Sequence, residues 1–175
     1  MSTHVPLVVL GGGPGGYAAA FLAADLGMEV AIVEREERLG GTCLLRGCIP
    51  SKALLQSSEH FEHANHHFAD HGISAKDIPI DVAKMVARKD QVVKQNNDGI
   101  LYLFKKNKVT FFHGRGSFVG KDDTGFQVQI AGKDSVQISA PQVIVATGSS
   151  ARAFPGVPFD EDKVLSNDGA LRMGA

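Results

Sequence analysis

Apolar residues gather in short runs along the chain, and the character of each run predicts the element it forms. Residues 5–10, 28–34 and 142–149 are mostly apolar and β-branched, which is typical of buried parallel strands. Residues 17–27 are rich in alanine and leucine and stop at Gly27, which predicts a helix with a glycine C-cap. The first two strands and this helix predict a βαβ unit within about 30 residues.

Two longer stretches of the chain predict helices. Residues 49–71 predict one helix, which we expect to end near Gly72. Residues 78–108 carry apolar positions at helical spacing and predict a second helix, with an irregularity around residues 96–99. The two helices would separate the βαβ unit from the later strands.

Alternating residues follow the second helix and predict a small antiparallel meander. The short strand 109–112 precedes three alternating segments, at 116–120, 126–130 and 135–139, which are separated by DDTG and AGKD turns. The whole pattern predicts an α/β fold, in which a parallel sheet carries this meander.

A glycine-rich segment, GGGPGG, joins the first predicted strand to the first predicted helix. Gly11, Gly13 and Gly16 form G-x-G-x-x-G, and an acid, Glu34, ends the next strand about 20 residues later. In this context the pattern predicts a Rossmann-like dinucleotide site: a tight turn, close approach of a pyrophosphate, and close packing of helix on strand. Glu34 favours an unphosphorylated ribose, as in FAD or NAD. The alternative is a glycine-rich turn that binds no ligand.

Composition and charge narrow the classes of function. The chain has 175 residues, is 43% hydrophobic and has a net charge of −1, which suits one sizeable domain and gives no electrostatic case for nucleic acid or a membrane surface. It has no run of about 18 apolar residues, and its N-terminal residues do not match a signal peptide. We therefore expect a cytoplasmic protein.

The two cysteines of the chain lie in the segment GGTCLLRGCIPSK, residues 40–52. A zinc site needs about four ligands, and the chain has no second cysteine pair. A purely structural disulfide would close a very short loop and would be exceptional in the cytosol. Both interpretations are weaker than a third one, in which Cys43 and Cys48 form a redox-active pair.

The residues around Cys48 support the redox interpretation. Pro50 suits the first turn of a helix, so Cys48 is expected at a helix N-terminus, where the dipole stabilises a thiolate. Lys52 follows four residues later and therefore lies on the same helical face. We expect Cys43 to lie outside the helix on a glycine-flanked loop, turned outward, while Cys48 is buried towards a cofactor.

These motifs resemble the flavoprotein disulfide reductases. The resemblance rests on the glycine loop, Glu34, GGTCLLRGCIPSK and VIVATGS. Within that family, CIPSKALL and LYLFKKNKVTFFHGRGSF are most similar to the dihydrolipoamide dehydrogenases. Sister enzymes such as glutathione or mercuric reductase are the alternative.

The resemblance implies a set of FAD-binding residues and a route for electrons. Cys43 would exchange with lipoamide, Cys48 would form the charge-transfer thiolate, and Lys52 would lie beside the flavin ring. Electrons would pass from the cysteines to FAD and then to NAD. The implied FAD-binding residues are Gly11, Gly13, Gly16, Glu34, Arg35, Leu39, Gly40, Gly41, Thr42, Cys43, Lys52, Gly114, Gly116, Thr147, Gly148 and Ser149.

The resemblance also implies partners and a domain division. The partners are the lipoamide-bearing acyltransferase of 2-oxoacid dehydrogenase complexes and a second copy of the chain; nucleic acid and membranes are not expected. Residues 1–149 would form the FAD-binding domain, and residues 150–175 a linker towards an NAD-binding domain that this sequence does not contain. We therefore expect a truncated chain with little turnover alone, and a non-catalytic FAD-binding fragment is a further alternative.

Five histidines follow one stretch of the first long helix. A pair such as His63 and His67 has the spacing of metal ligands, but no cysteine or carboxylate cluster accompanies it. We interpret the stretch as a solvated face and predict no metal site.

Overall fold

The computed structural model describes residues 3–172 and divides the chain into two compact units. One comprises Met1–Leu45 and Asn96–Ser150, and is here named the sheet unit. The other comprises Arg46–Gln95 and Ala151–Ala175, and is named the helical unit. The predicted functional division after residue 149 stays a prediction, because these units are defined by compactness alone.

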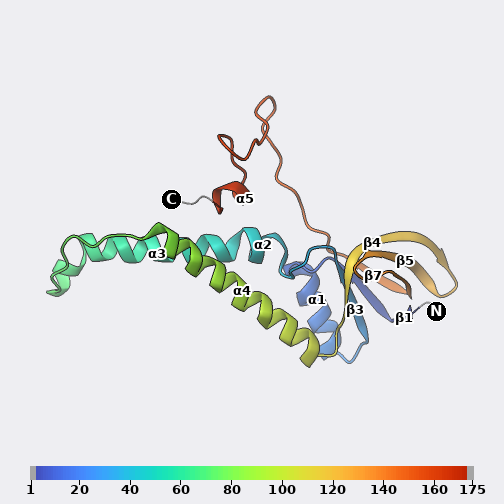
Figure 1. Ribbon diagram of the computed structural model, residues 1–175. Helices are drawn as coiled ribbons and strands as arrows, with labels where there is room; N and C mark the ends of the chain where they lie inside the picture. Colours follow the sequence, from blue (N-terminus) through green and yellow to red (C-terminus); the bar gives the residue numbers. More distant parts are fainter. Residues whose placement is uncertain (1–2, 173–175) are drawn as a thin grey trace. The chain divides into compact units, whose positions relative to one another are not determined.

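The sheet unit is built on a seven-stranded sheet with the order β1-β6-β5-β4-β3-β2-β7 (Figure 1). Its four strands β7, β2, β3 and β4 pair in parallel, and β4, β5 and β6 form the antiparallel meander. The fold class predicted from the sequence is confirmed. The strands are β1 (Thr3–His4), β2 (Leu7–Leu10), β3 (Val30–Glu34), β4 (Thr110–Asp122), β5 (Gly125–Gly132), β6 (Val136–Ala140) and β7 (Gln142–Val145).

Strand β4 joins two segments that the sequence presents as separate strands. Its first residues, from Thr110 to His113, pair in parallel with β3. From Gly114 onward the same strand pairs antiparallel with β5. The predicted break between 112 and 116 was wrong, because glycines that look like a turn in sequence are accommodated in a continuous strand. A single strand therefore couples the parallel half of the sheet to the meander.

The core of the sheet unit lies on the strands. Val8, Val128, Ile130 and Ile138 are fully buried, which accounts for their β-branched character on a covered sheet face. The first helix, α1 (Pro14–Asp25), and the last turns of α4 (Val82–Lys106) meet through the rings of Phe21 and Phe104, whose centroids are 5.2 Å apart.

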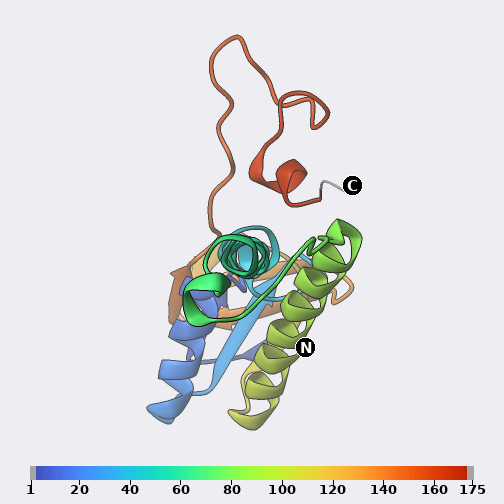
Figure 2. The same cartoon turned by 90° about the vertical axis from the view of Figure 1, so that its left-hand side faces the viewer.

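The two long helices that the sequence predicts are present with shifted bounds: α3 lies in the helical unit, and α4 begins there and continues into residues of the sheet unit. Helix α3 (Cys48–His66) is followed by a short 3₁₀ turn, η1 (Phe68–His71). Gly72, at φ +74°, ends η1, and the helical stretch therefore ends where the sequence predicts. After η1 the chain turns back and reaches the start of α4 through an irregular segment (Figure 2). Helix α4 is continuous over 82–106, so the predicted irregularity at 96–99 was wrong.

Three short elements were not predicted. They are β1, helix α2 (Gly41–Arg46) and helix α5 (Asn167–Ala170). Each is too short to carry a periodic pattern of its own. Over residues 3–172, none of the helices combines the length and apolar character that crossing a bilayer requires.

Candidate functional site

The glycine loop lies between the end of β2 and the start of α1. Gly11 adopts φ +109°, a conformation that residues with a side chain rarely adopt. A Cβ at Gly16 would clash with the Gly11 carbonyl oxygen, and one at Gly11 with the Ala146 carbonyl oxygen. These two glycines are therefore required by the fold itself.

Gly13 is different, because the protein leaves room beside it. It is the N-cap of α1, and a Cβ there would meet only Gly41 Cα, at an ordinary 3.6 Å. The first helical residue is Pro14, and α1 has no acidic side chain in its first turn. The amides and the positive end of the α1 dipole are thus available to an anion, such as a pyrophosphate, that approaches Gly13.

Glu34 closes β3 and is fixed by main-chain amides. Its Oε2 accepts the Gly12 N–H at 2.7 Å, and its Oε1 accepts the Glu36 N–H at 2.9 Å. A carboxylate has about four lone-pair sites, so two acceptor positions are left for hydroxyl groups of a ligand. The acid is half-buried and held in one orientation at the mouth of the glycine loop.

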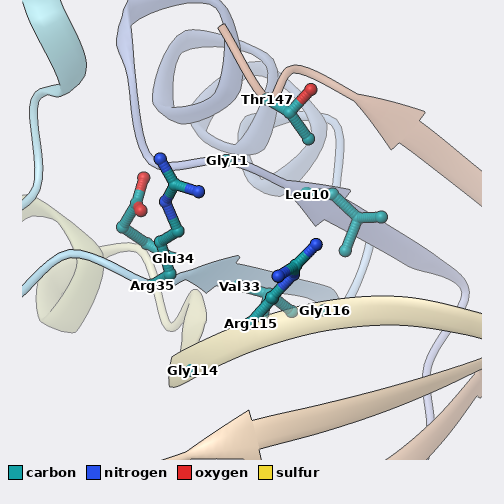
Figure 3. A pocket seen from close by; sticks show the side chains of 9 residues that line it. All are labelled: Leu10, Gly11, Val33, Glu34, Arg35, Gly114, Arg115, Gly116 and Thr147. Carbon is teal, nitrogen blue, oxygen red and sulfur yellow. The ribbon is translucent and has the colours of Figure 1, made fainter.

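A pocket of about 310 Å³ opens at this end of the sheet. Glu34 and Arg35 come from the end of β3, Arg115 rises from β4, and Thr147 lies across from them after β7 (Figure 3). The pocket brings together predicted residues from four separate parts of the sequence. Its lining is Leu10, Gly11, Val33, Glu34, Arg35, Gly114, Arg115, Gly116 and Thr147.

Three of these lining residues were missed from the sequence. Leu10 and Val33 are buried apolar residues at the ends of β2 and β3. Nothing in their residue type distinguishes them from other core positions of a strand. Arg115 lies between Gly114 and Gly116, which were predicted, so the HGRG segment could have suggested it. A Cβ at Gly116 would come within 2.8 Å of Leu10 Cδ2, so packing also favours glycine there.

The loop before the cysteines packs directly on the glycine loop. Gly40 donates its N–H to the Gly12 carbonyl oxygen at 2.8 Å, and a Cβ at Gly41 would lie 2.7 Å from Gly13 Cα. Helix α2 begins at Gly41, and its third residue is Cys43. The predicted pyrophosphate loop and the cysteine segment are therefore neighbours in space.

Buried Asn97 on α4 is hydrogen-bonded to the same loop. Its side-chain amide donates to the Leu39 carbonyl oxygen at 2.7 Å, and both residues are buried. Sequence reasoning missed this contact, because Asn97 lies where an irregular helix was expected.

Several predicted residues lie outside the pocket lining. They occupy the glycine loop and α1, the β3–α2 connection, helices α2 and α3, and the exposed chain after β7. Their suggested contacts with FAD stay predictions. They are Gly13, Gly16, Leu39, Gly40, Gly41, Thr42, Cys43, Cys48, Lys52, Gly148 and Ser149.

The cysteines form a disulfide. Both are disulfide-bonded, and because the chain has only two, the bond joins Cys43 to Cys48. Cys48 is the first residue of α3, as predicted. Two other expectations were wrong: Cys43 lies in helix α2 rather than on an open loop, and Cys48 is the exposed cysteine while Cys43 is half-buried.

The start of α3 favours negative charge at Cys48. The helix has no acidic residue in its first turn, and Pro50 is its third residue. Ser51 donates both its amide, at 3.0 Å, and its hydroxyl, at 2.5 Å, to the Gly47 carbonyl oxygen, which fixes the first turn. Lys52 is exposed one turn after Cys48. This geometry stabilises a thiolate when the disulfide is reduced.

The histidine stretch of α3 is solvent-exposed. The rings of His63 and His67 lie 5.1 Å apart, and His67 Nε2 is 3.2 Å from Glu62 Oε1. Within residues 3–172, no group of three or more histidine, cysteine or acidic side chains is arranged to hold a metal ion.

Three comparisons with known proteins agree with one another. The family described as pyridine nucleotide-disulphide oxidoreductase matches residues 5–173. Dihydrolipoyl dehydrogenase of Cupriavidus necator is 52% identical over 100% of this chain, and the mitochondrial dihydrolipoyl dehydrogenase of Pisum sativum is 46% identical over 95%. The crystal structure of LpdA from Mycobacterium tuberculosis superposes with a TM-score of 0.79 over 99% of this chain, at 25% identity.

The chain spans only part of these relatives. It covers 38% of the Cupriavidus protein, 33% of the pea protein and 38% of the Mycobacterium chain. The similarity therefore concerns about a third of each relative.

Proposed function

This chain belongs to the pyridine nucleotide-disulphide oxidoreductase family, and on that premise we propose that it carries the FAD-binding and disulfide-bearing part of a dihydrolipoamide dehydrogenase. One observation carries the proposal: the Cys43–Cys48 disulfide joins α2 to the first residue of α3, while α2 itself starts against the glycine loop. A redox pair and a dinucleotide loop are thereby linked through a few residues of one segment.

The residues present fit FAD. Gly13 leaves the space that a pyrophosphate needs, the α1 N-terminus supplies amides, and Glu34 keeps acceptor positions for ribose hydroxyls. The pocket between Glu34, Gly116 and Thr147 suits the adenosine end. These residues would hold FAD, which would supply an acceptor for the electron pair of the reduced cysteines and a hydride donor for NAD.

Disulfide exchange follows from the position of Cys48. In this proposal a dihydrolipoamide thiolate attacks Sγ of the half-buried Cys43, not Sγ of the exposed Cys48, which forms a mixed disulfide and releases Cys48 as a thiolate. Cys48 is the better leaving group because the α3 N-terminus and Lys52 stabilise its negative charge. The second substrate thiol then attacks the substrate sulfur of the mixed disulfide, releases Cys43 and closes the lipoamide ring. The substrate loses two electrons and two protons; the cysteine pair takes up the two electrons, and the protons pass to the released cysteine sulfurs or to water.

Partners and location are part of the proposal. The dithiol that suits this exchange is the lipoyl group of the acyltransferase in a 2-oxoacid dehydrogenase complex. A second copy of the chain is the expected partner in the complete enzyme. A cytoplasmic location is consistent with a cysteine pair that cycles between dithiol and disulfide.

The test uses the purified chain and its absorption spectrum. FAD should bind and colour the protein yellow, and reduction of the cysteine pair should add a long-wavelength band from the Cys48 thiolate beside the flavin. Cys48→Ser should remove that band, whereas Cys43→Ser, the matched control, should retain it. A chain that stays colourless with excess FAD would sink the proposal. A chain that binds FAD but shows no band in either variant would be a nucleotide-binding module without the redox role.

A further inference from the structure

Helix α5 contacts Arg46, one of the four residues between the two cysteines. Within the helical unit, Asn167 donates its side-chain amide to the Arg46 carbonyl oxygen, and Asp168 Oδ2 lies 3.6 Å from Arg46 Nη1. Arg46 is the last residue of α2, and only Gly47 stands between it and Cys48. A segment more than 100 residues away in the sequence is therefore bonded to the main chain two residues before Cys48.

The other end of α5 is anchored independently. Lys89 on α4 is only 6% exposed, and its Nζ donates to the Leu171 carbonyl oxygen at 3.0 Å. Its second partner is Asp90 Oδ1, at 2.8 Å. A buried ammonium without partners is costly, so this contact fixes the end of α5. Ser166 caps the start of α5 by accepting the Asp168 N–H at 3.1 Å.

The ion pair between Asp168 and Arg46 affects which positive charges can reach Cys48. By sequence, the charged side chains next to Cys48 are Arg46 and Lys52, and Asp168 pairs with Arg46. Arg46 would stabilise a Cys48 thiolate if its guanidinium were free to turn towards it. The Asp168 carboxylate instead pairs with this cation and holds it at α5. The ion pair is about one-third exposed on each side, so its effect is modest.

We propose that Asp168 is a positioning residue for the Cys43–Cys48 redox pair, which acts by holding the Arg46 guanidinium away from Cys48. Asn167 fixes the Arg46 main chain, so that the side chain is presented to Asp168. The inference rests on the proposed redox function. It assigns a tuning role to the tail segment, which the sequence presents only as a linker.

The first experiment measures the pH midpoint of Cys48 alkylation by iodoacetamide in a Cys43→Ser background, where Cys48 is the only thiol. Asp168→Asn frees Arg46, so its midpoint should fall by about 0.2–0.7 pH units. Arg46→Gln should leave the midpoint almost unchanged, because Asp168 already keeps this guanidinium from Cys48 in the parent. Asp162→Asn removes an acid from the same tail without an Arg46 contact and should leave the midpoint unchanged. An unchanged midpoint in Asp168→Asn would overturn the inference.

The double variant tests whether Asp168 acts through Arg46. In an Arg46→Gln background, Asp168→Asn should no longer shift the midpoint; an undiminished shift would show a direct field effect and overturn the positioning role. If Asp168→Asn fails to fold, as judged by circular dichroism, Asp168→Ser takes its place: a lowered midpoint supports the inference, and an unchanged midpoint contradicts it.

The second experiment equilibrates the two-cysteine chain with glutathione. Two glutathione thiols become one glutathione disulfide as Cys43–Cys48 gains two electrons and becomes a dithiol. Asp168→Asn should favour the reduced chain by about 1.4- to 5-fold relative to the parent, whereas Asp162→Asn should not. A parent chain whose cysteines cannot be cycled at all would refute the proposed function. A parent that cycles normally beside an unshifted Asp168→Asn would refute only this inference.

Discussion

The main-chain amide of Gly12 donates a 2.7 Å hydrogen bond to Glu34 Oε2, and this bond joins the glycine loop to the end of β3. The second oxygen of the same carboxylate accepts the Glu36 amide at 2.9 Å. Glu34 is therefore a structural clamp before any ligand binds, in addition to its proposed role towards a ribose. Each role has its own measurement: the unfolding free energy reports the clamp, and FAD affinity reports the ribose contact.

Glu34→Gln should weaken both the loop and the proposed FAD site. Glutamine keeps one acceptor oxygen but places an amide donor against the N–H of Gly12 or Glu36. Loss of a charge-assisted hydrogen bond should cost about 1.5–3 kcal/mol of unfolding free energy, measured by urea denaturation, and FAD titration should show at least about tenfold weaker binding. Glu37→Gln, an exposed neighbour, should change neither quantity.

Two glycines of one motif should respond differently to alanine. Gly16→Ala should destabilise the fold, because its methyl group would clash with the Gly11 carbonyl oxygen. Gly13→Ala should leave thermal unfolding almost unchanged, since its methyl group has room in the protein, yet it should reduce FAD binding by occupying the space of the pyrophosphate. Equal loss of stability in both variants would contradict the assignment of Gly13 to a ligand.

Asn97 should matter for stability although it is far from the glycine motif in sequence. Asn97→Leu leaves the Leu39 carbonyl oxygen without its buried donor, which should cost about 1–3 kcal/mol of unfolding free energy. Gln95→Leu is a control on an exposed position of the same helix and should stay within about 0.5 kcal/mol. Chemical denaturation of both variants measures the difference.

The hydrogen bonds that stabilise the turn at Asp160 should be lost only at acidic pH. The pKa of Asp160 is lowered from its ordinary value of 3.8, chiefly because its carboxylate accepts main-chain N–H groups of Asp162, Val164 and Lys163. A lowered folded pKa means that the turn is fully stabilised above the unfolded pKa and loses this stabilisation as the pH falls through the folded value. Amide NMR signals of residues 162–164 should therefore stay constant down to about pH 4.5 and shift below about pH 4.

The control for that titration is Asp160→Asn. It removes the titrating group, so the same amide signals should show no acid transition. A transition that persists in the variant would assign the pH dependence to another group.

The sequence by itself determined the elements whose causes are local. Gly11 adopts a positive φ, and Gly16 packs against the Gly11 carbonyl oxygen, which leaves no room for a side chain. The glycine motif therefore predicts the unit formed by β2, the loop and α1. Pro50 in the first turn likewise placed Cys48 at the start of α3. The family resemblance followed from these motifs, since dinucleotide and disulfide chemistry constrain residues that are close in sequence.

Only the tertiary structure decided the contacts that join distant segments. Sequence periodicity could not show that β4 continues from the parallel sheet into the meander, because strand pairing depends on partners elsewhere in the chain. It could not pair Asn97 with Leu39, 58 residues apart, or Asn167 with Arg46, 121 residues apart. Such polar contacts leave no periodic signal. They arise because buried or anchored donors need acceptors wherever the fold brings one within reach.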